Sequence, residues 1–350
     1  MHDRWRRVAG LLVSLTLLAC IAGWLPQAEA AIISTKEEIE IGRRVAMELE
    51  TKYGLAEDPD LQARVARIGA KIAAASDRQD IIYSFKVLNN KEVNALALPG
   101  GYVYLFKGLT DYMPSDEELA GIIGHEVGHI TKRHTVRQIE KSLGMSILFG
   151  VLFGDRGIFL QNLAFNAIMA GYSREDEREA DHLGYYHSVR AGYNPYSMLM
   201  GLQKLEDLAK DKKGSYGLFS THPEPEARVA RVQGYLNEAK VHPTVTAKGA
   251  TALAIDPGLT LPPLTATYRG NKPLYRAYLL AGALYLAART GDFNPDRFIL
   301  DGDGTYITIY YDDRVITTLT PQDASAAGMS LDDFSRQYVD GIKAWAALQK

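Results

Sequence analysis

The stretch that decides how this chain folds is Asp116-Glu-Glu-Leu-Ala-Gly-Ile-Ile-Gly-His125-Glu126-Val-Gly-His129-Ile-Thr-Lys-Arg-His134. Residues four apart on a helix project from nearly the same face, so His125 and His129 can present two imidazoles to one metal ion. Glu126 projects a step around the helix, where its carboxylate can reach a metal-bound water and accept a proton. The pattern predicts a zinc-binding helix with its own general base.

The flanking residues support a helix at this position. Ser115 and Glu118 have the spacing of a capping box, in which each side chain satisfies a backbone N–H at the start of a helix. Gly121, Gly124 and Gly128 each cost about 1 kcal/mol relative to alanine inside a helix. We therefore expect another backbone to approach this helix closely where the glycines lie.

A solvated amphipathic helix with two surface histidines is the alternative, and the agreement between motif, cap and flanks argues against it. His134 lies off the i, i+4 spacing from His129. We expect His134 to be a structural polar residue.

A catalytic zinc site usually has three protein ligands, and the segment Tyr172–Gly184 can supply the third. Four of its acidic residues are chemically suitable: Glu175, Asp176, Glu177 and Glu179. Glu177 and Asp181 share a helical face with small Ala180 and Gly184, which suits close packing and favours Glu177 as the ligand. Asp181 would then accept an imidazole N–H from a ligand histidine. A charged, solvent-facing helix is the alternative for this segment.

Four pieces of the chain resemble, in family order, metallopeptidase family 48, a gluzincin group that includes HtpX heat-shock proteases, periplasmic BepA-type proteases and CAAX prenyl proteases. They are Asn94-Ala-Leu-Ala-Leu-Pro-Gly-Gly101, His125-Glu-Val-Gly-His129, Glu177-Arg-Glu-Ala-Asp181 and Thr221-His-Pro-Glu-Pro-Glu-Ala-Arg228. The resemblance covers residues 35 to 240 or so. It implies that His125, His129 and Glu177 bind one Zn²⁺ per chain, that Glu126 is the general base and that Asp181 is the supporting acid.

His222 precedes Pro223, which favours an extended backbone for the histidine. In BepA-like members the matching histidine is implied to close the open zinc position as a reversible fourth ligand. In the prenyl-protease branch the matching histidine and arginine are implied to stabilise the tetrahedral intermediate. We hypothesise one or both roles for His222, with Arg228 placing positive charge near the developing oxyanion. A purely structural role, in which His222 caps the following helix, is the alternative.

Residues 101–106, Gly-Tyr-Val-Tyr-Leu-Phe, have strand composition after a Pro-Gly-Gly turn signal. In gluzincins such a strand lies along the active-site cleft, and we expect an extended substrate to pair with it by main-chain hydrogen bonds. An interior strand with only a packing role is the alternative.

The first 30 residues have the features of a signal peptide: three arginines, an apolar run from Val8 to Leu25, and Ala28-Glu29-Ala30. We expect a periplasmic or secreted protein. An uncleaved membrane anchor is one alternative. Lipoprotein anchoring through Cys20 is another, because Leu17-Leu-Ala-Cys20 resembles a lipobox, and Cys20 is the single cysteine of the chain.

With 350 residues, of which 47% are hydrophobic and 23% charged, the chain can form one large core and a smaller module. The predicted fold class is α+β: a mostly helical gluzincin-type zinc metalloprotease domain with a small sheet at residues 31–240, and a small C-terminal α/β module. Helices are expected at 35–52, 61–75, 194–208 and 224–239, and strands at 81–88 and 95–106. Residues 143–170 are expected to form a core helix or a mobile lid, with a membrane-touching lid as the minority interpretation.

Residues 241–270 contain four prolines and predict an extended linker before a module of unknown role at 271–350. In that module we expect a helix at 274–289, a hairpin of 305–311 with 314–319, and a capped helix at 330–348. Asp301-Gly-Asp-Gly304 lacks most calcium-ligand positions and predicts a turn.

These features predict a zinc metalloendopeptidase that cleaves unfolded or misfolded envelope proteins, with outer-membrane proteins or their assembly machinery as possible partners. The alternative is a zinc-locked chaperone or assembly factor with little proteolysis. The net charge of −3 indicates no nucleic-acid partner. The sequence shows no 34-residue helical repeat of the kind that follows the protease domain in some BepA-like relatives.

Overall fold

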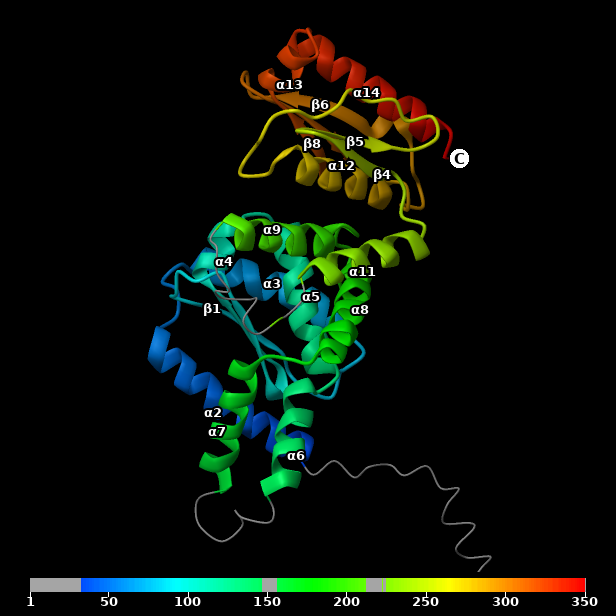
Figure 1. Ribbon diagram of the computed structural model, residues 1–350. Coiled ribbons are helices and arrows are strands. Elements are labelled where there is room, and N and C mark those ends of the chain that lie inside the picture. Colours follow the sequence, from blue (N-terminus) through cyan, green and yellow to red (C-terminus); the bar gives the residue numbers. More distant parts are fainter. Residues whose placement is uncertain (1–32, 147–155, 212–221, 223–224, 350) are drawn as a thin grey trace, which may run out of the picture. The chain divides into compact units, whose positions relative to one another are not determined.

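The computed structural model describes residues 33–146, 156–211, 222 and 225–349 (Figure 1). Residues 35–350 form one compact unit. The predicted signal peptide and Cys20 lie outside the described residues. Within the described ranges, no helix has both the length and the apolar character that a membrane crossing requires.

Two helices open the compact unit, α2 (Thr35–Tyr53) and α3 (Pro59–Ala75), as predicted. The Asp58 carboxylate caps α3 by accepting a hydrogen bond from the backbone N–H of Leu61. The helix buries Val65 and Ile68, one turn apart, against the sheet and the metal-site helix. Its apolar face therefore supports the floor of the domain.

The sheet of this domain has the order β1-β3-β2, so β3 is the central strand. β1 (Ser84–Leu88) pairs parallel with β3 (Tyr102–Phe106), and β2 (Ala95–Leu98) pairs antiparallel with β3 across the Pro99–Gly101 turn, η1. The expectation that residues 101–106 pair with a substrate is wrong, because β3 already has a hydrogen-bonded strand on each side. The interior alternative is correct, and β2 is an edge strand.

One buried carboxylate joins three parts of this domain. Glu38 on α2 accepts hydrogen bonds from Arg78 at 2.8 Å, from Arg133 at 2.8 Å and from the backbone N–H of Gly100 at 3.0 Å. Arg78 also donates to the carbonyl of Ile130 at 2.8 Å, near the end of the metal-site helix. The pairing fixes the turn before β3 relative to that helix.

Short helix α4 (Lys107–Tyr112) precedes α5 (Asp116–Thr131), the predicted metal-site helix. The capping box is present: Glu118 N–H donates to Ser115 Oγ at 3.2 Å, and Ser115 N–H donates to the Glu118 carboxylate at 2.8 Å. The other Glu118 oxygen contacts the buried Lys204 ammonium. The start of α5 is therefore held by both local and tertiary contacts.

Five more helices of this domain lie in the described residues: α6 (His134–Ser146), α7 (Arg156–Ala170), α8 (Arg174–Arg190), α9 (Ser197–Asp211) and α11 (Pro225–Glu238). The predicted apolar stretch 143–170 is divided between α6 and α7, and residues 147–155 lie outside the described residues. α7 packs against α2 and β2, burying Leu160 and Ile168 and leaving Ile158 and Met169 exposed. It is half-buried rather than a core helix.

The linker prediction for residues 241–270 is wrong. Residues Thr244–Lys248 and Thr251–Ile255 form an antiparallel hairpin, β4 and β5, that packs on α12 (Pro273–Ala287). Pro243 and Pro257 lie just outside the two strands, where they interrupt no ladder hydrogen bond. The prolines mark the ends of strands, and composition alone did not separate that pattern from an extended linker.

The rest of the C-terminal module follows the prediction more closely. A three-stranded antiparallel sheet has the order β6-β7-β8, and the predicted hairpin is β7 with β8. The elements are β6 (Phe298–Gly302), β7 (Ile307–Tyr311), β8 (Arg314–Leu319), α13 (Pro321–Ala326) and α14 (Leu331–Ala347), with a short turn η2 (Pro295–Arg297). β6 was not predicted, because only Phe298 of its five residues is buried. The turn predicted for residues 301–304 is shorter than expected, because Asp301 and Gly302 end β6. Asp303 stabilises the turn before β7 by accepting hydrogen bonds from two backbone N–H groups.

The module and the metal-site domain share one apolar core, which includes Tyr196 and Leu199 from one side and Tyr278 and Leu280 from the other. The rings of Tyr196 and Tyr278 stack with centroids 5.1 Å apart. Asn194 donates to the carbonyl of Tyr278 at 3.3 Å. The predicted fold class, a mostly helical α+β domain with a small α/β module, is confirmed.

The module contains a buried ion pair between Arg276 and Asp323, whose side chains are 4% and 0% exposed. Burial alone would raise the pKa of Asp323, but Arg276 and the backbone N–H groups of Thr265 and Ala266 outweigh it and lower the pKa to about 2. The ordinary value is 3.8, so this stabilisation is complete above that pH and is lost as the pH falls towards 2.

Asp323→Asn should lower the free energy of unfolding by about 3 to 5 kcal/mol near neutral pH, because it leaves a buried guanidinium without its carboxylate. Chemical denaturation across the pH range measures the effect. The difference from the wild type should shrink as the pH approaches about 2, where Asp323 is itself protonated. Asp313→Asn, at an exposed turn position, is the control and should change stability by less than about 0.5 kcal/mol. A difference that does not depend on pH would contradict the ion-pair explanation.

Candidate metal centre

Helices α5 and α8 lie in backbone contact because glycines face each other along their interface. A Cβ atom on Gly128 would lie 2.7 Å from the carbonyl oxygen of Ala180. One on Gly184 would lie 2.6 Å from the backbone nitrogen of His125. These distances confirm the predicted close approach, and the contact places the acidic face of α8 beside the histidines of α5.

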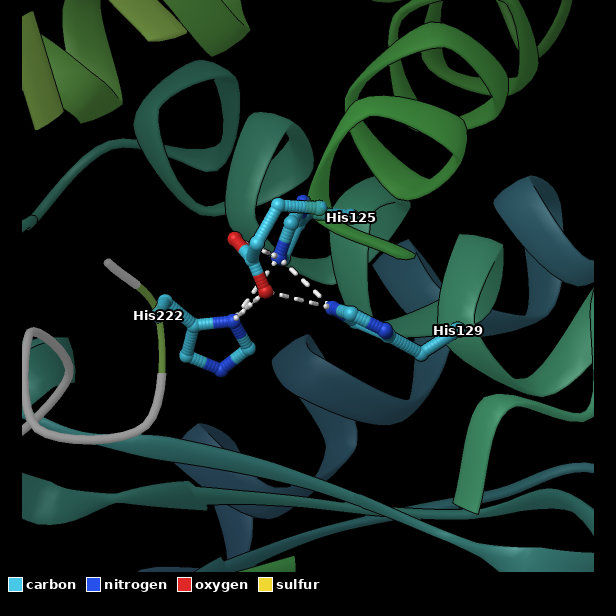
Figure 2. A group of neighbouring side chains, drawn as sticks. His125, His129 and His222 are labelled. Atoms are coloured by element: carbon cyan, nitrogen blue, oxygen red, sulfur yellow. Dashed lines mark hydrogen bonds and ion pairs between the residues drawn. The ribbon is translucent and has the colours of Figure 1, made fainter. Parts of the chain in front are cut away.

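Four buried side chains converge at this interface: His125, His129, Glu177 and His222. Figure 2 shows the three imidazoles directed towards one point. The Nε2 atoms of His125 and His129 are 2.9 Å apart, and His222 Nδ1 lies 2.8 Å from Glu177 Oε1. One ligand atom from each of the four residues lies within 4.8 Å of all the others, which is the arrangement of a metal site.

Only one of the four acidic candidates joins this cluster. Glu177 lies in it, whereas Glu175 is exposed and pairs with Arg178. Asp176 and Glu179 lie in a neighbouring group with His134. The structure therefore places in the cluster the residue that the helical spacing favours and that the resemblance implies.

Glu126 provides a test of whether the residues fit a zinc ion. Its side chain is fully buried, and neither carboxylate oxygen has a hydrogen-bond partner among the described residues. A buried carboxylate without a partner is costly, and a cation with its water would compensate for that cost. Imidazole nitrogens with one carboxylate are also a donor set that suits zinc. The residues present fit the ion.

The electrostatics of His129 and Glu177 favour the protonation states that a metal requires, whereas those of His222 favour the protonated imidazole, which must lose its proton before it can bind a metal. Burial, reinforced by the neighbouring His125, holds the pKa of His129 well below its ordinary value, so the imidazole is neutral. Burial alone would raise the pKa of Glu177, but His222, Arg228 and His125 hold it well below its ordinary value. Burial opposes the charged form of His222 as well, and the Glu177 carboxylate outweighs that effect and raises its pKa. A neutral imidazole and an ionised carboxylate are the ligand forms.

Asp181 lies where the sequence predicted the partner of a ligand histidine. Its Oδ1 is 3.1 Å from His125 Nδ1, and it also accepts hydrogen bonds from Arg228 at 2.8 Å and Arg231 at 3.0 Å. Burial would raise the pKa of Asp181, but Arg228 and His125 keep it far below its ordinary value. An ionised Asp181 accepts the Nδ1–H of His125 and leaves Nε2 directed at the cluster.

Arg228 is buried and contacts two carboxylates of the site. Its Nη2 donates to Asp181, and its Nη1 lies 3.0 Å from Glu177 Oε2, although no hydrogen bond is directed along the second contact. The guanidinium therefore offsets part of the negative charge of the two carboxylates. Its role towards an oxyanion stays a prediction.

Two further residues touch His129 and were not predicted to do so. The Tyr172 ring stacks on His129 with centroids 3.7 Å apart and an interplanar angle of 19°. His134 Nδ1 lies 2.7 Å from His129 Nδ1, and burial lowers the pKa of His134. Neither residue has a helical spacing that relates it to His129, because His134 begins α6 and Tyr172 lies between α7 and α8.

A comparison with known families agrees with this geometry. The model described as "Peptidase family M48" matches residues 59–236, just over half of the chain, and these residues include every side chain of the site. The chain belongs to peptidase family M48. The predicted resemblance is confirmed. A second model, described as "Domain of unknown function (DUF8459)", matches residues 257–349, which lie within the C-terminal module.

Relatives of this family M48 chain come from bacteria and mitochondria. The "Beta-barrel assembly-enhancing protease" of Yersinia pestis is 29% identical over 254 residues, covering 68% of this chain and 51% of the relative. The "Mitochondrial metalloendopeptidase OMA1" of Arabidopsis thaliana is 37% identical over 161 residues, covering 45% of this chain and 32% of the relative. "Metalloprotease YcaL" of Escherichia coli is 26% identical over 239 residues, covering 66% of this chain and 89% of the relative. The chain spans about half the length of the beta-barrel assembly-enhancing proteases it matches.

Gly184→Ala tests the close contact of α5 and α8. The added Cβ meets the backbone of His125, so the helices must separate, and stability should fall by about 1 to 3 kcal/mol although alanine favours helices. Zinc affinity should fall with it. Gly234→Ala in α11 is the matched control, because no atom lies within 4 Å of the added Cβ, and it should raise stability by up to about 1 kcal/mol. Chemical denaturation and zinc titration measure both, and equal behaviour of the two variants would refute the packing argument.

Proposed function

We propose that this chain is a zinc-dependent metalloendopeptidase that hydrolyses peptide bonds in unfolded or misfolded proteins of the cell envelope. The observation that carries the proposal is the buried Glu126 carboxylate, which has no hydrogen-bond partner in the described part of the chain and lies next to the converging side chains of His125, His129 and Glu177. His222 Nε2 lies 3.7 Å from its Oε1, beyond hydrogen-bond distance. A site built only to hold a structural metal does not need such a carboxylate. A hydrolytic site needs it as a base.

In this proposal His125, His129 and Glu177 hold one Zn²⁺. The ion, when bound, would lower the pKa of a water and polarise the scissile carbonyl. Glu126 would take a proton from the attacking water and pass it to the nitrogen of the leaving amine. Asp181 would hold the His125 ring in its tautomer, and the Arg228 cation would favour negative charge developing on the carbonyl oxygen.

We further propose that a substrate pairs with the edge strand β2. Tyr172, which stacks on His129, contacts the Ala97 carbonyl on β2 through its hydroxyl at 3.4 Å. This contact supports a position for β2 beside the metal ligands. Main-chain pairing would bind an extended chain with little demand on its sequence, as suits a protease of unfolded proteins.

His222 would be the fourth ligand in a closed state of the site. Its Nδ1 lies 3.1 Å from His125 Nε2 and 2.8 Å from Glu177 Oε1, in the group that could hold the ion. Four protein ligands leave no position for water, as in structural zinc sites. His222 would therefore have to move away before a substrate carbonyl binds. The same contacts favour the second candidate function, a zinc-locked chaperone or assembly factor with little proteolysis.

The proposed location is the periplasm or the exterior, after removal of residues 1–30. The N-terminal sequence pattern supports it, with anchoring through Cys20 as the minority alternative. The name of the Yersinia pestis relative, beta-barrel assembly-enhancing protease, associates that protein with beta-barrel assembly. We propose by analogy that outer-membrane proteins, or the machinery that assembles them, are partners of this chain.

Glu126→Gln should reduce cleavage of an unfolded protein such as casein by about 10²- to 10⁴-fold, because the amide cannot accept the proton. Bound zinc, measured by metal analysis, should remain at one ion per chain. Exposed Glu92 provides the control, since Glu92→Gln should cleave as fast as the wild type. Chelation should abolish cleavage by the wild type, and added zinc should restore it. Undiminished cleavage by Glu126→Gln would exclude its role as the base.

His222→Ala should raise kcat/KM on the same substrate if the imidazole closes the site. His242→Ala is the matched control, because His242 also precedes a proline and is largely exposed. A lower kcat at unchanged zinc content would instead support a role in stabilising the tetrahedral intermediate. No change would reject both roles. Absence of cleavage by every variant, with zinc bound and aggregation of a client protein suppressed, would favour the chaperone function.

A further inference from the structure

The two histidines of α5 differ in what holds their second ring nitrogen. His125 has the usual arrangement, with Nδ1 beside the Asp181 carboxylate at 3.1 Å. Among the residues that the structure describes, no carboxylate contacts Nδ1 of His129. The nearest group is the imidazole of His134, whose Nδ1 is 2.7 Å away, and the His134 side chain is fully buried.

The direction of this hydrogen bond follows from the role of His129. The Nε2 atom of His129 faces the ligand cluster, 2.9 Å from His125 Nε2 and 3.4 Å from Glu177 Oε1. If Nε2 supplies a lone pair to the ion, the ring proton is on Nδ1 and is donated to His134 Nδ1. His134 then carries its own proton on Nε2, which lies 3.1 Å from Glu179 Oε2 and 3.6 Å from Asp176 Oδ1.

We propose that His134 is a positioning residue, a neutral imidazole that links the zinc ligand His129 to the Glu179 carboxylate and so sets the tautomer and ring orientation of His129. The proposal rests on the proposed function of the site as a zinc centre. Asp181 orients the ring of His125, and His134 would orient the ring of His129 in the same way. Here the support has two steps, because the carboxylate lies one imidazole further away.

The surroundings hold His134 in place. The left-handed conformation of Arg133, with φ of 54°, turns the chain between α5 and α6 so that His134 returns to the end of α5. Arg133 is fixed by its hydrogen bond to Glu38 at 2.8 Å. The turn is thus tied to the same buried carboxylate that holds the Pro99–Gly101 turn.

The acidic end of the link is also anchored. Arg137, one turn further along α6, contacts Glu179 at 2.9 Å and Asp176 at 2.8 Å. Asp176 is engaged in the capping box of α8, accepting from the Ser173 hydroxyl at 2.7 Å. Both carboxylates therefore have fixed positions relative to His134.

A second metal site is the competing explanation, because His134, Asp176 and Glu179 each offer a ligand atom within 4.8 Å of the others. Two observations argue against it. The Arg137 guanidinium contacts both carboxylates, and Lys132 lies 3.9 Å from Glu179, so two cations already offset their charge. In addition, the Nδ1 atom of His134 accepts the proton of His129 Nδ1, so His134 carries its own proton on Nε2 and cannot bind a second ion there. The two explanations differ in zinc content, one ion per chain for the link and two for a second site.

The test compares His134→Phe with His134→Gln in the full chain. Phenylalanine fills the site without a polar atom, and the dissociation constant for zinc, measured by competition with a chelator, should rise about 10- to 100-fold. In glutamine the amide oxygen can accept from His129 and the amide N–H can donate to Glu179, so His134→Gln should recover most of the affinity. Absorption spectra of the cobalt-substituted proteins should show a changed ligand geometry for the phenylalanine variant alone.

The control is His187→Phe, which also removes a fully buried histidine, from α8 and away from the ligands. It should leave the zinc dissociation constant unchanged, and thermal unfolding of the metal-free proteins measures the purely structural cost of both changes. If His134→Phe does not fold, Glu179→Gln takes its place, with Glu175→Gln as its exposed control on the same helix. A several-fold loss of affinity in the first and none in the second is then expected.

Wild-type zinc affinity in His134→Phe, or in Glu179→Gln if the first does not fold, would overturn the proposal. So would a His134→Gln variant as weak as His134→Phe, or two zinc ions per wild-type chain. Failure of the proposed function gives a different result: the wild type would bind one zinc ion without any cleavage that depends on Glu126. The role of His134 would still be read from the dissociation constants.

Discussion

The backbone contact between α5 and α8 is the constraint on which the site depends. Two imidazoles on one helix cannot complete a metal site, and the acidic ligand comes from a helix about fifty residues later in the chain. Side chains as short as Glu177 and Asp181 reach the histidines because Gly124, Gly128 and Gly184 remove the Cβ atoms that would keep the helices apart. The propensity cost of glycine in a helix is offset by this proximity.

Close packing also concentrates charge, and the site is arranged to offset it. The carboxylates of Glu126, Glu177 and Asp181 are all buried, with Arg228 and the partly exposed Arg231 as the nearest guanidinium groups. Glu126 differs from the other two carboxylates because no described side chain forms a hydrogen bond with it, and that difference separates a base from a ligand.

The C-terminal module bears on the site through the start of α5. Buried Lys204 contacts Glu118 in the capping box and donates to Asn271 of the module at 3.0 Å, so the helix that carries the ligands begins at a junction of the two parts. Sequence reasoning treated the parts as separate and joined by a linker. It could not find the junction, because prolines at strand ends and prolines in a linker have the same composition, and only the shared apolar core distinguishes them.

The sequence by itself determined the elements whose signals are local. The i, i+4 histidines, the capping box, the glycine spacing and the hairpin between residues 307 and 319 depend on neighbours along the chain, and they were predicted correctly. The tertiary structure decided what depends on residues distant in sequence. It made β3 central and β2 an edge strand, and it brought Tyr172 and His134 against His129. Such choices follow from how turns and packed helices orient side chains in space, and no spacing along the chain encodes them.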